Sequence, residues 1–228
     1  PHKVKLHNWR IPKEEASDES FVIFFEDEIK LLRKMPIQLT PNNKLYHEAG
    51  RLRNKVEQNL EVIRDNVLMG IYTCLRFSDL MSLTEEDLRK EPTGWRIIKT
   101  LKKSKIVVSI DLPPSAVGII KKYEGKYKTL LPPMSEMTFN HNFKRLGYYF
   151  KEYIEQQEEL GLMKGKSYNN WKEFVVIKTV NGEHKKTPVP TPEVLSSHCC
   201  RKSGISYLLS KGMNEFEVKK ISGHKFNS

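Results

Sequence analysis

Two arginines and two histidines in three separate segments are the residues of this sequence whose chemistry suits a phosphate. Arg76 follows a strongly apolar stretch, His198 and Arg201 are three residues apart, and His224 comes 26 positions after His198. Guanidinium groups make bidentate contacts to phosphate oxygens, and imidazoles donate hydrogen bonds or move protons. His198 and Arg201 would share one face at the start of a helix, where backbone amides add further donors. Fixed cations and hydrogen-bond donors of this kind suit the stabilisation of negative charge that grows on a phosphodiester during cleavage.

The formal charge of +11, from 39 basic and 28 acidic residues, favours a polyanionic partner. Nucleic acid is the usual one, although a solvated basic surface would have the same composition. No carboxylate cluster of metal-ligand type accompanies the four residues, so a two-metal nuclease mechanism is not favoured. A zinc site built on His184, His198, Cys199 and Cys200 is disfavoured, because adjacent helical cysteines point about 100° apart.

The cysteines and the apolar residues bear on location. Three cysteines, two of them adjacent, make a disulfide framework unexpected and favour the reducing cytoplasm. The sequence has no apolar run near the roughly 20 residues of a membrane helix, and its first residues do not resemble a secretory signal. We expect no membrane partner.

Several helices and one hairpin must position these side chains in the first half of the chain. Charge patterning predicts a helix over Glu26–Lys34, with acidic residues first and basic residues last. The apolar stripe Leu60, Ile63, Val67 and Ile71 predicts a buried helix that leads to the Arg76 segment. Residues 95–99 and 106–110 read as two strands of a hairpin with a lysine-rich tip.

The second half of the chain predicts further helices and a second hairpin. Helices are expected at 115–123, opened by Pro114, and around the apolar stripe from Phe139 to Ile154. Residues 171–180 and 183–188 flank Asn181-Gly182, a strong turn signal. Prolines at 188, 190 and 192 suggest an extended connector. The last helices are expected at 197–211 and 214–222, the second opened at capping-box spacing by Asn214.

The three segments resemble the signatures of the tyrosine recombinase (phage integrase) family. Leu75-Arg76-Phe77-Ser78-Asp79-Leu80 resembles the GLR-x-x-E/D-L box, His198-Cys199-Cys200-Arg201 the H-x-x-R box, and Gly223-His224 the GH box. The hairpin between the first two boxes and the interval between the last two also fit. The residues of these boxes are most similar to those of integrases from conjugative transposons and other mobile elements. The resemblance covers roughly residue 21 to the end, and implies an α+β fold, mainly helical with a small antiparallel sheet.

The resemblance also implies roles for individual residues. Arg76 and Arg201 would clamp the scissile phosphate, while His198 and His224 would donate hydrogen bonds and assist proton transfer. Lys99 would protonate the leaving 5′-hydroxyl. As alternatives, Arg76 would be an ordinary surface arginine, His198 a helix cap, His224 a solvated loop residue and Lys99 an edge-strand lysine that discourages strand pairing.

The resemblance also implies supporting roles for residues close to Arg76 and Lys99 in the sequence. Asp79 would orient Arg76. Lys102, Lys103 and Lys105 at the hairpin tip would contact the DNA backbone. Because these three lysines share the hairpin with Lys99, the sequence leaves open which lysine is catalytic.

The nucleophilic tyrosine of the family would lie about nine residues after the GH histidine, near position 233. None of the nine tyrosines follows His224, and Tyr207 is expected to pack inside a helix. We therefore interpret residues 1–20 as a linker or arm and 21–228 as a catalytic domain that ends before its nucleophile. The N-terminal core-binding domain usual in the family is not expected within the 228 residues.

The resemblance implies site-specific cutting and rejoining of double-stranded DNA through a 3′-phosphotyrosine, in integration or excision of a mobile element. Because that link stores the energy of the cleaved bond, the resemblance implies no cofactor, neither ATP nor a metal. The expected assembly is a homotetramer on two duplexes, with possible DNA-bending accessory factors, in the cytoplasm and at the bacterial nucleoid when active. A resolvase-type recombinase acting on replicon dimers shares this chemistry. A type IB topoisomerase shares the arginine, lysine and histidine set. A catalytically inactive DNA-binding regulator on the same fold is the alternative from another class.

Overall fold

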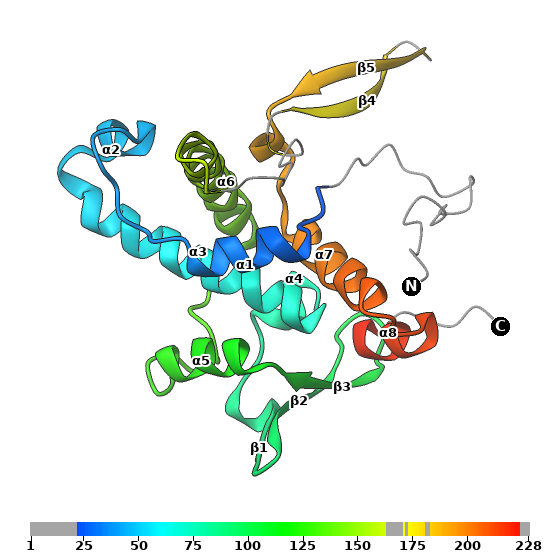
Figure 1. Ribbon diagram of the computed structural model, residues 1–228. Helices are drawn as coiled ribbons and strands as arrows, with labels where there is room; N and C mark the ends of the chain where they lie inside the picture. Colours follow the sequence, from blue (N-terminus) through cyan, green and yellow to red (C-terminus); the bar gives the residue numbers. More distant parts are fainter. Residues whose placement is uncertain (1–21, 163–170, 172, 181–182, 224–228) are drawn as a thin grey trace.

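The helix α3 (Arg53–Thr73) runs through the middle of the molecule and organises the fold (Figure 1). We describe a computed structural model over residues 22–162, 171, 173–180 and 183–223. Leu60, Ile63, Val67 and Ile71 are all at most 2% exposed, so the predicted apolar stripe is the buried face of α3. Helices α1, α5, α6 and α7 pack against it. Residues 65–71 of this helix are all buried, whereas its first turns keep exposed polar residues such as Lys55 and Gln58.

The other helices surround α3 and agree with most of the boundaries expected from the sequence. Their bounds are α1 (Glu26–Lys34), α2 (Lys44–Ala49), α4 (Phe77–Leu80), α5 (Pro114–Tyr123), α6 (Glu136–Glu159), α7 (Ser197–Ser210) and α8 (Glu215–Ser222). Short 3₁₀ turns lie at Gly50–Leu52, Glu85–Asp87 and Thr191–Val194. The last of these replaces the extended connector that the prolines suggested, because Pro192 is tolerated in the first turn of a helix. The Asn214 side chain caps α8 by accepting from the amide of Glu217.

A small antiparallel sheet covers one side of the helices. Its strands β1 (Leu88–Glu91), β2 (Gly94–Thr100) and β3 (Val107–Leu112) pair in that order. Ile97 pairs with Ile110, and both side chains are buried in the core. The fold is therefore α+β, as expected. The sequence did not predict β1, because three of its four residues are charged and only Leu88 is buried.

A second hairpin lies apart from this sheet. Strands β4 (Phe174–Val180) and β5 (Glu183–Val189) pair only with each other among the described strands. They project from the helical body between α6 and α7 in the chain (Figure 1). The hairpin was predicted, and its turn residues, Asn181 and Gly182, lie outside the described residues. At its base, the buried Trp171 ring packs edge-on against Phe24 and Phe150.

The described residues include neither a membrane-spanning helix nor a cluster of metal-binding side chains. None of their helices has the length and apolar content that crossing a bilayer requires. Nor do they bring together three or more histidine, cysteine or acidic side chains in a geometry that could hold a metal ion.

Candidate functional site

Arg76 emerges at a sharp turn between α3 and α4. Helix α3 ends at Cys74, whose φ of 53° lies in the left-handed region that side-chain-bearing residues seldom adopt. This turn reverses the chain, so that Leu75 is buried in the core and Arg76 becomes the N-cap of α4 in an extended conformation. The guanidinium of Arg76 is thereby directed to a surface pocket instead of continuing along α3.

Arg201 approaches the same place from α7. Its side chain is only 3% exposed, and its Nη1 donates a hydrogen bond of 2.7 Å to the carbonyl oxygen of Cys74. Burial, followed by the nearby charge of Arg76, lowers the pKa of Arg201 to about 10. Two guanidiniums from segments more than 100 residues apart are therefore close enough to repel each other.

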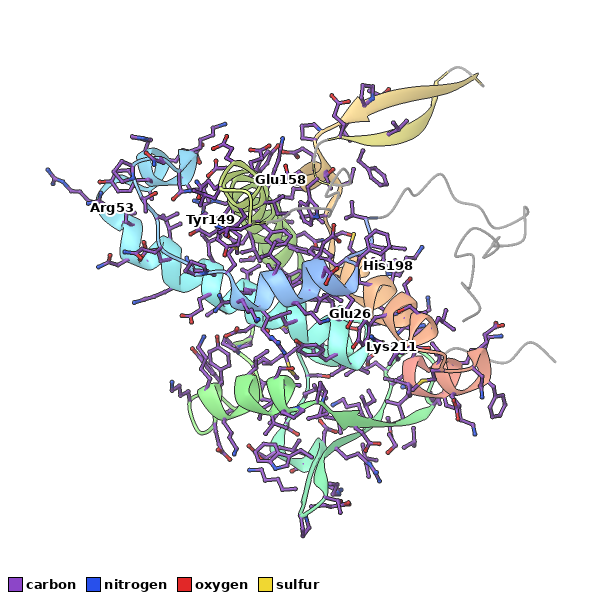
Figure 2. All side chains as sticks on the ribbon, in the orientation of Figure 1. Glu26, Arg53, Tyr149, Glu158, His198 and Lys211 are labelled. Carbon is purple, nitrogen blue, oxygen red and sulfur yellow. The ribbon has the colours of Figure 1, made fainter. Side chains whose placement is uncertain are left out.

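A pocket of about 180 Å³ lies between α4, the start of α6 and the start of α7. Figure 2 shows His198 at the beginning of α7, where its side chain is exposed, and Lys211 near the other end of the helix. The pocket is lined by Arg76, Phe77, Ser78, Glu136, Ser197, His198 and Arg201. The structure thus brings together three of the four residues that the sequence assigned to one phosphate.

The Nη1 atom of Arg76 is buried and has no hydrogen-bond partner among the residues that the structure describes. Leaving a charged donor unpaired in a buried position costs about 1–3 kcal/mol or more. The remedy in proteins is usually a water, an ion or a ligand. An oxyanion in the pocket would satisfy this donor and would also reduce the repulsion between the two guanidiniums.

The fourth residue, His224, lies outside the described residues. The glycine before it, Gly223, is described, and its position ties the end of α8 to the sheet. Gly223 ends α8 with a φ of 67° and packs directly on the side chain of Leu101, at the start of the β2–β3 turn. A Cβ at this position would overlap with Leu101 Cδ1. The end of α8 therefore packs closely against the β2–β3 hairpin, which carries the candidate lysines.

Lys99 does not line the pocket. Its Nζ donates to the carbonyl oxygen of Ser82 at 2.9 Å and to the Asp87 carboxylate at 2.8 Å, and its side chain is 13% exposed. The ammonium group is thus bound to the protein itself. The catalytic role of Lys99 stays a prediction, and Lys99 is not the edge-strand lysine of the alternative, because β2 is the central strand of the sheet.

Lys102 does not line the pocket either, but it contacts a residue that does. Its Nζ lies 3.3 Å from the carbonyl oxygen of Ser78, which lines the pocket, and its side chain is exposed. Lys103 and Lys105 are also exposed at the hairpin tip. Lys105 has a φ of 59°, a left-handed residue that closes the turn between Leu101 and Ile106.

Asp79 links α4 to this turn. The side chain is fully buried, and its Oδ1 accepts a hydrogen bond of 2.9 Å from the backbone amide of Lys102. Its Oδ2 has no partner among the described residues. The hydrogen bond therefore positions the hairpin, whereas the predicted orientation of Arg76 by Asp79 has no hydrogen bond here to support it and stays a prediction.

Sequence reasoning missed three residues of this site. Cys74 supplies the carbonyl that holds Arg201, while Glu136 and Asn140 on α6 accept hydrogen bonds from the hydroxyl (2.5 Å) and the amide (2.8 Å) of Ser197. A signal existed for Cys74, because the resembled box has glycine at this place, where a left-handed turn is expected. For Glu136 and Asn140, the sequence contains no such signal, because their four-residue spacing indicates only that they share a face of α6.

Searches for related sequences gave no match. Neither a protein-family model nor a curated protein matches this chain.

Solved structures do match. The site-specific recombinase XerH, in a post-cleavage complex with a palindromic difH substrate, matches over 92% of this chain and 48% of its own, with a TM-score of 0.50 and 12% identity. The Tn1549 transposon integrase, in complex with transposon right-end DNA, matches over 95% of this chain and 61% of its own, with a TM-score of 0.48 and 18% identity. The chain spans about half the length of the first of these structures. It has the fold of a tyrosine recombinase catalytic domain, as the sequence motifs suggested.

Proposed function

We propose that this chain is the catalytic domain of a site-specific DNA recombinase that cuts and rejoins DNA through a 3′-phosphotyrosine. The observation that carries the proposal is the meeting of Arg76 and Arg201 in one pocket, with the Nη1 of Arg76 buried and unpaired. The positive charge of Arg76 acts on Arg201, and an anion bound between the two guanidiniums would reduce their repulsion. The residues of the motif around Arg76 favour a role in integration or excision of a mobile element.

In the proposed reaction, both arginines contact the nonbridging oxygens of the scissile phosphate. Their charge is preorganised where negative charge grows as the pentavalent transition state forms, which is the most effective electrostatic arrangement. His198, exposed at the mouth of the pocket, donates a further hydrogen bond. His224 completes the set and assists proton transfer. The protein residues alone supply this chemistry.

The lysine that protonates the leaving 5′-oxygen is Lys102 in this proposal. Its side chain is exposed, its ammonium group contacts the carbonyl oxygen of the pocket residue Ser78, and Asp79 holds its backbone amide. Lys99 instead stabilises the fold through its ion pair with Asp87, in which both side chains are mostly buried. Lys103 and Lys105 are exposed and free to follow the DNA backbone.

The attacking tyrosine in this proposal belongs to the segment after residue 228, near position 233. The active assembly is a homotetramer on two DNA duplexes, aided by bending factors where the target requires them. A resolvase acting on replicon dimers would use the same pocket. An inactive regulator would bind DNA through it without forming a covalent bond.

DNA binding by the 228-residue chain gives the first test. We expect salt-sensitive binding of a short duplex, because phosphate contacts release counterions. Arg201→Ala and Arg76→Ala should each weaken binding more than Arg51→Ala, which removes the same charge from an exposed turn. Equal effects of the three substitutions on duplex affinity would show that the pocket is not the phosphate site.

Covalent trapping tests the reaction. A longer protein that includes the segment after residue 228 is incubated in EDTA with a nicked suicide duplex, and an adduct is expected. Lys102→Ala should block trapping on ordinary DNA and should recover on a duplex with a 5′-bridging sulfur, which leaves without protonation. Lys99→Ala should not show this recovery. DNA binding without any adduct would identify the inactive regulator, and sulfur rescue of Lys99→Ala would return the catalytic role to Lys99.

A further inference from the structure

The pocket that holds the two arginines also contains a carboxylate. Glu136, the first residue of α6, lines it together with Arg76 and Arg201. The hydrogen-bond partner of Glu136 is the neutral hydroxyl of Ser197, at 2.5 Å. Among the described residues Glu136 forms no ion pair within 4 Å. Its negative charge therefore remains available to influence any anion that enters.

This carboxylate is held in place by the chain. Ser135 caps α6 through its own side chain, so Glu136 is not needed for capping. Asn140, one turn further along α6, accepts from the backbone amide of Ser197, which fixes the first residue of α7 against α6. Glu136 thus keeps its position relative to His198 and Arg201, because all three depend on the same contact between two helix ends.

A fixed negative charge changes which phosphates a two-arginine pocket prefers. Such a pocket alone would bind a dianion more tightly than a monoanion, since each guanidinium attracts the added charge. A carboxylate in the pocket repels the dianion more strongly than the monoanion and offsets this preference. An internal DNA phosphodiester carries one negative charge, whereas a terminal phosphate at a nick or an end carries nearly two above about pH 7.

Building on the proposed phosphate pocket, we propose that Glu136 is a specificity-determining residue that makes the pocket select monoanionic phosphodiesters over dianionic phosphomonoesters. Free phosphate and DNA ends, which are abundant competitors for a pair of arginines, are then disfavoured. The Ser197 hydroxyl positions the carboxylate, and the selectivity comes from its charge.

Two small anions test this selectivity without DNA. Dimethyl phosphate is a monoanion and methyl phosphate is nearly a dianion at about pH 8. Their dissociation constants for the 228-residue chain are measured by phosphorus NMR at constant ionic strength. Glu136→Gln keeps a hydrogen-bond acceptor for Ser197 and removes only the charge. It should shift the ratio of the two constants by about three- to tenfold in favour of methyl phosphate, allowing for solvent screening of an exposed group.

Two control variants separate charge from position. Glu193→Gln removes the same charge from a residue outside the pocket, which contacts Tyr148 and Lys144, and should leave the ratio within about twofold of the starting protein. Ser197→Ala removes the hydroxyl that positions the carboxylate but keeps the Glu136 charge, and should shift the ratio less than Glu136→Gln does. If Glu136→Gln is too unstable, the double variant Glu136→Ala/Ser197→Ala removes both partners together and should show the same shift.

The outcomes distinguish this inference from the proposed function. An unchanged ratio in Glu136→Gln, or an equal shift in Ser197→Ala, would overturn the selectivity role of Glu136 and leave the phosphate pocket intact. If Arg201→Ala bound both anions as well as the starting protein does, the phosphate pocket itself would be refuted.

Discussion

The Nη1 of Arg201 donates a hydrogen bond of 2.7 Å to the carbonyl oxygen of Cys74, two residues before Arg76. The left-handed backbone of Cys74, with a φ of 53°, makes this contact part of the turn that ends α3. The same turn therefore holds one arginine and directs the other. A left-handed conformation costs about 1–2 kcal/mol in a residue other than glycine, which the surrounding packing must offset.

Replacing Arg201 should separate function from stability. Arg201→Ala leaves the carbonyl of Cys74 without this donor, at a cost of about 1–3 kcal/mol, but it also removes a buried cation beside Arg76. Because the two effects oppose each other, the free energy of unfolding in urea should change by less than about 2 kcal/mol. Suicide-substrate cleavage by the longer protein should fall at least about 100-fold. Near-normal cleavage would remove Arg201 from the site.

The packing of α7 on α3 gives a second prediction. A Cβ on Gly204 would overlap with the carbonyl oxygen of Ile71 and lie 2.7 Å from the Sγ of Cys74. Gly204→Ala should therefore force α7 away from the Cys74 turn, at a cost of about 2–3 kcal/mol in unfolding free energy. It should also weaken duplex binding, because Arg76 and Arg201 separate.

A matched control exists in another helix. Gly118, in α5, has open space where a Cβ would lie. Gly118→Ala should stabilise the chain by about 0.5–1 kcal/mol in the same urea titration, through helix propensity. Similar effects from both substitutions would contradict the close approach of α7 to α3.

The contact between α8 and the β2–β3 turn gives a third prediction. Gly223 and Gly212 both have a positive φ, of 67° and 87°, but only Gly223 meets a neighbour, Leu101. Alanine at either position incurs the left-handed penalty of about 1 kcal/mol, and Gly223→Ala adds the overlap with Leu101. Thermal unfolding should therefore show a larger loss for Gly223→Ala, and suicide-substrate cleavage should fall only in that variant. Equal losses of stability and of cleavage in Gly223→Ala and Gly212→Ala would contradict the close packing of Gly223 on Leu101.

Glu28 gives a prediction for the dependence of stability on pH. Its carboxylate is 3% exposed and accepts hydrogen bonds from the amide of Phe25 and the indole of Trp171. Burial raises the pKa of Glu28 from its ordinary value of 4.5 to about 7. Between these values the folded protein keeps a proton that the unfolded chain has lost, so this contribution to stability falls as the pH rises.

The size of the effect follows from the shift in pKa. The contribution of Glu28 should decrease by roughly 2–3 kcal/mol between about pH 4.5 and pH 7. Glu28→Gln cannot titrate, so urea unfolding at several pH values should show the starting protein losing stability relative to the variant across this window. Parallel curves for the two proteins would mean that folding does not raise the pKa of Glu28.

Local patterns in the sequence determined most of the helices and both hairpins. The apolar stripe of α3 and the charge order of α1 are each set by residues close together in the chain, where helical spacing decides which side chains share a face. The motifs around Arg76 and Arg201 indicated phosphate chemistry because guanidinium groups suit it wherever they lie. Strand β1 escaped prediction, because its charged residues pair through backbone atoms that carry no sequence signal.

Only the tertiary structure decided which side chains meet at the pocket. Lys99 and Lys102 differ by three positions in the same hairpin, yet Lys99 is bound to Asp87 while Lys102 reaches Ser78. Glu136 enters the pocket because the start of α6 lies against the start of α7. Such contacts join residues far apart in the chain, and their geometry depends on how whole helices pack, which no short pattern specifies.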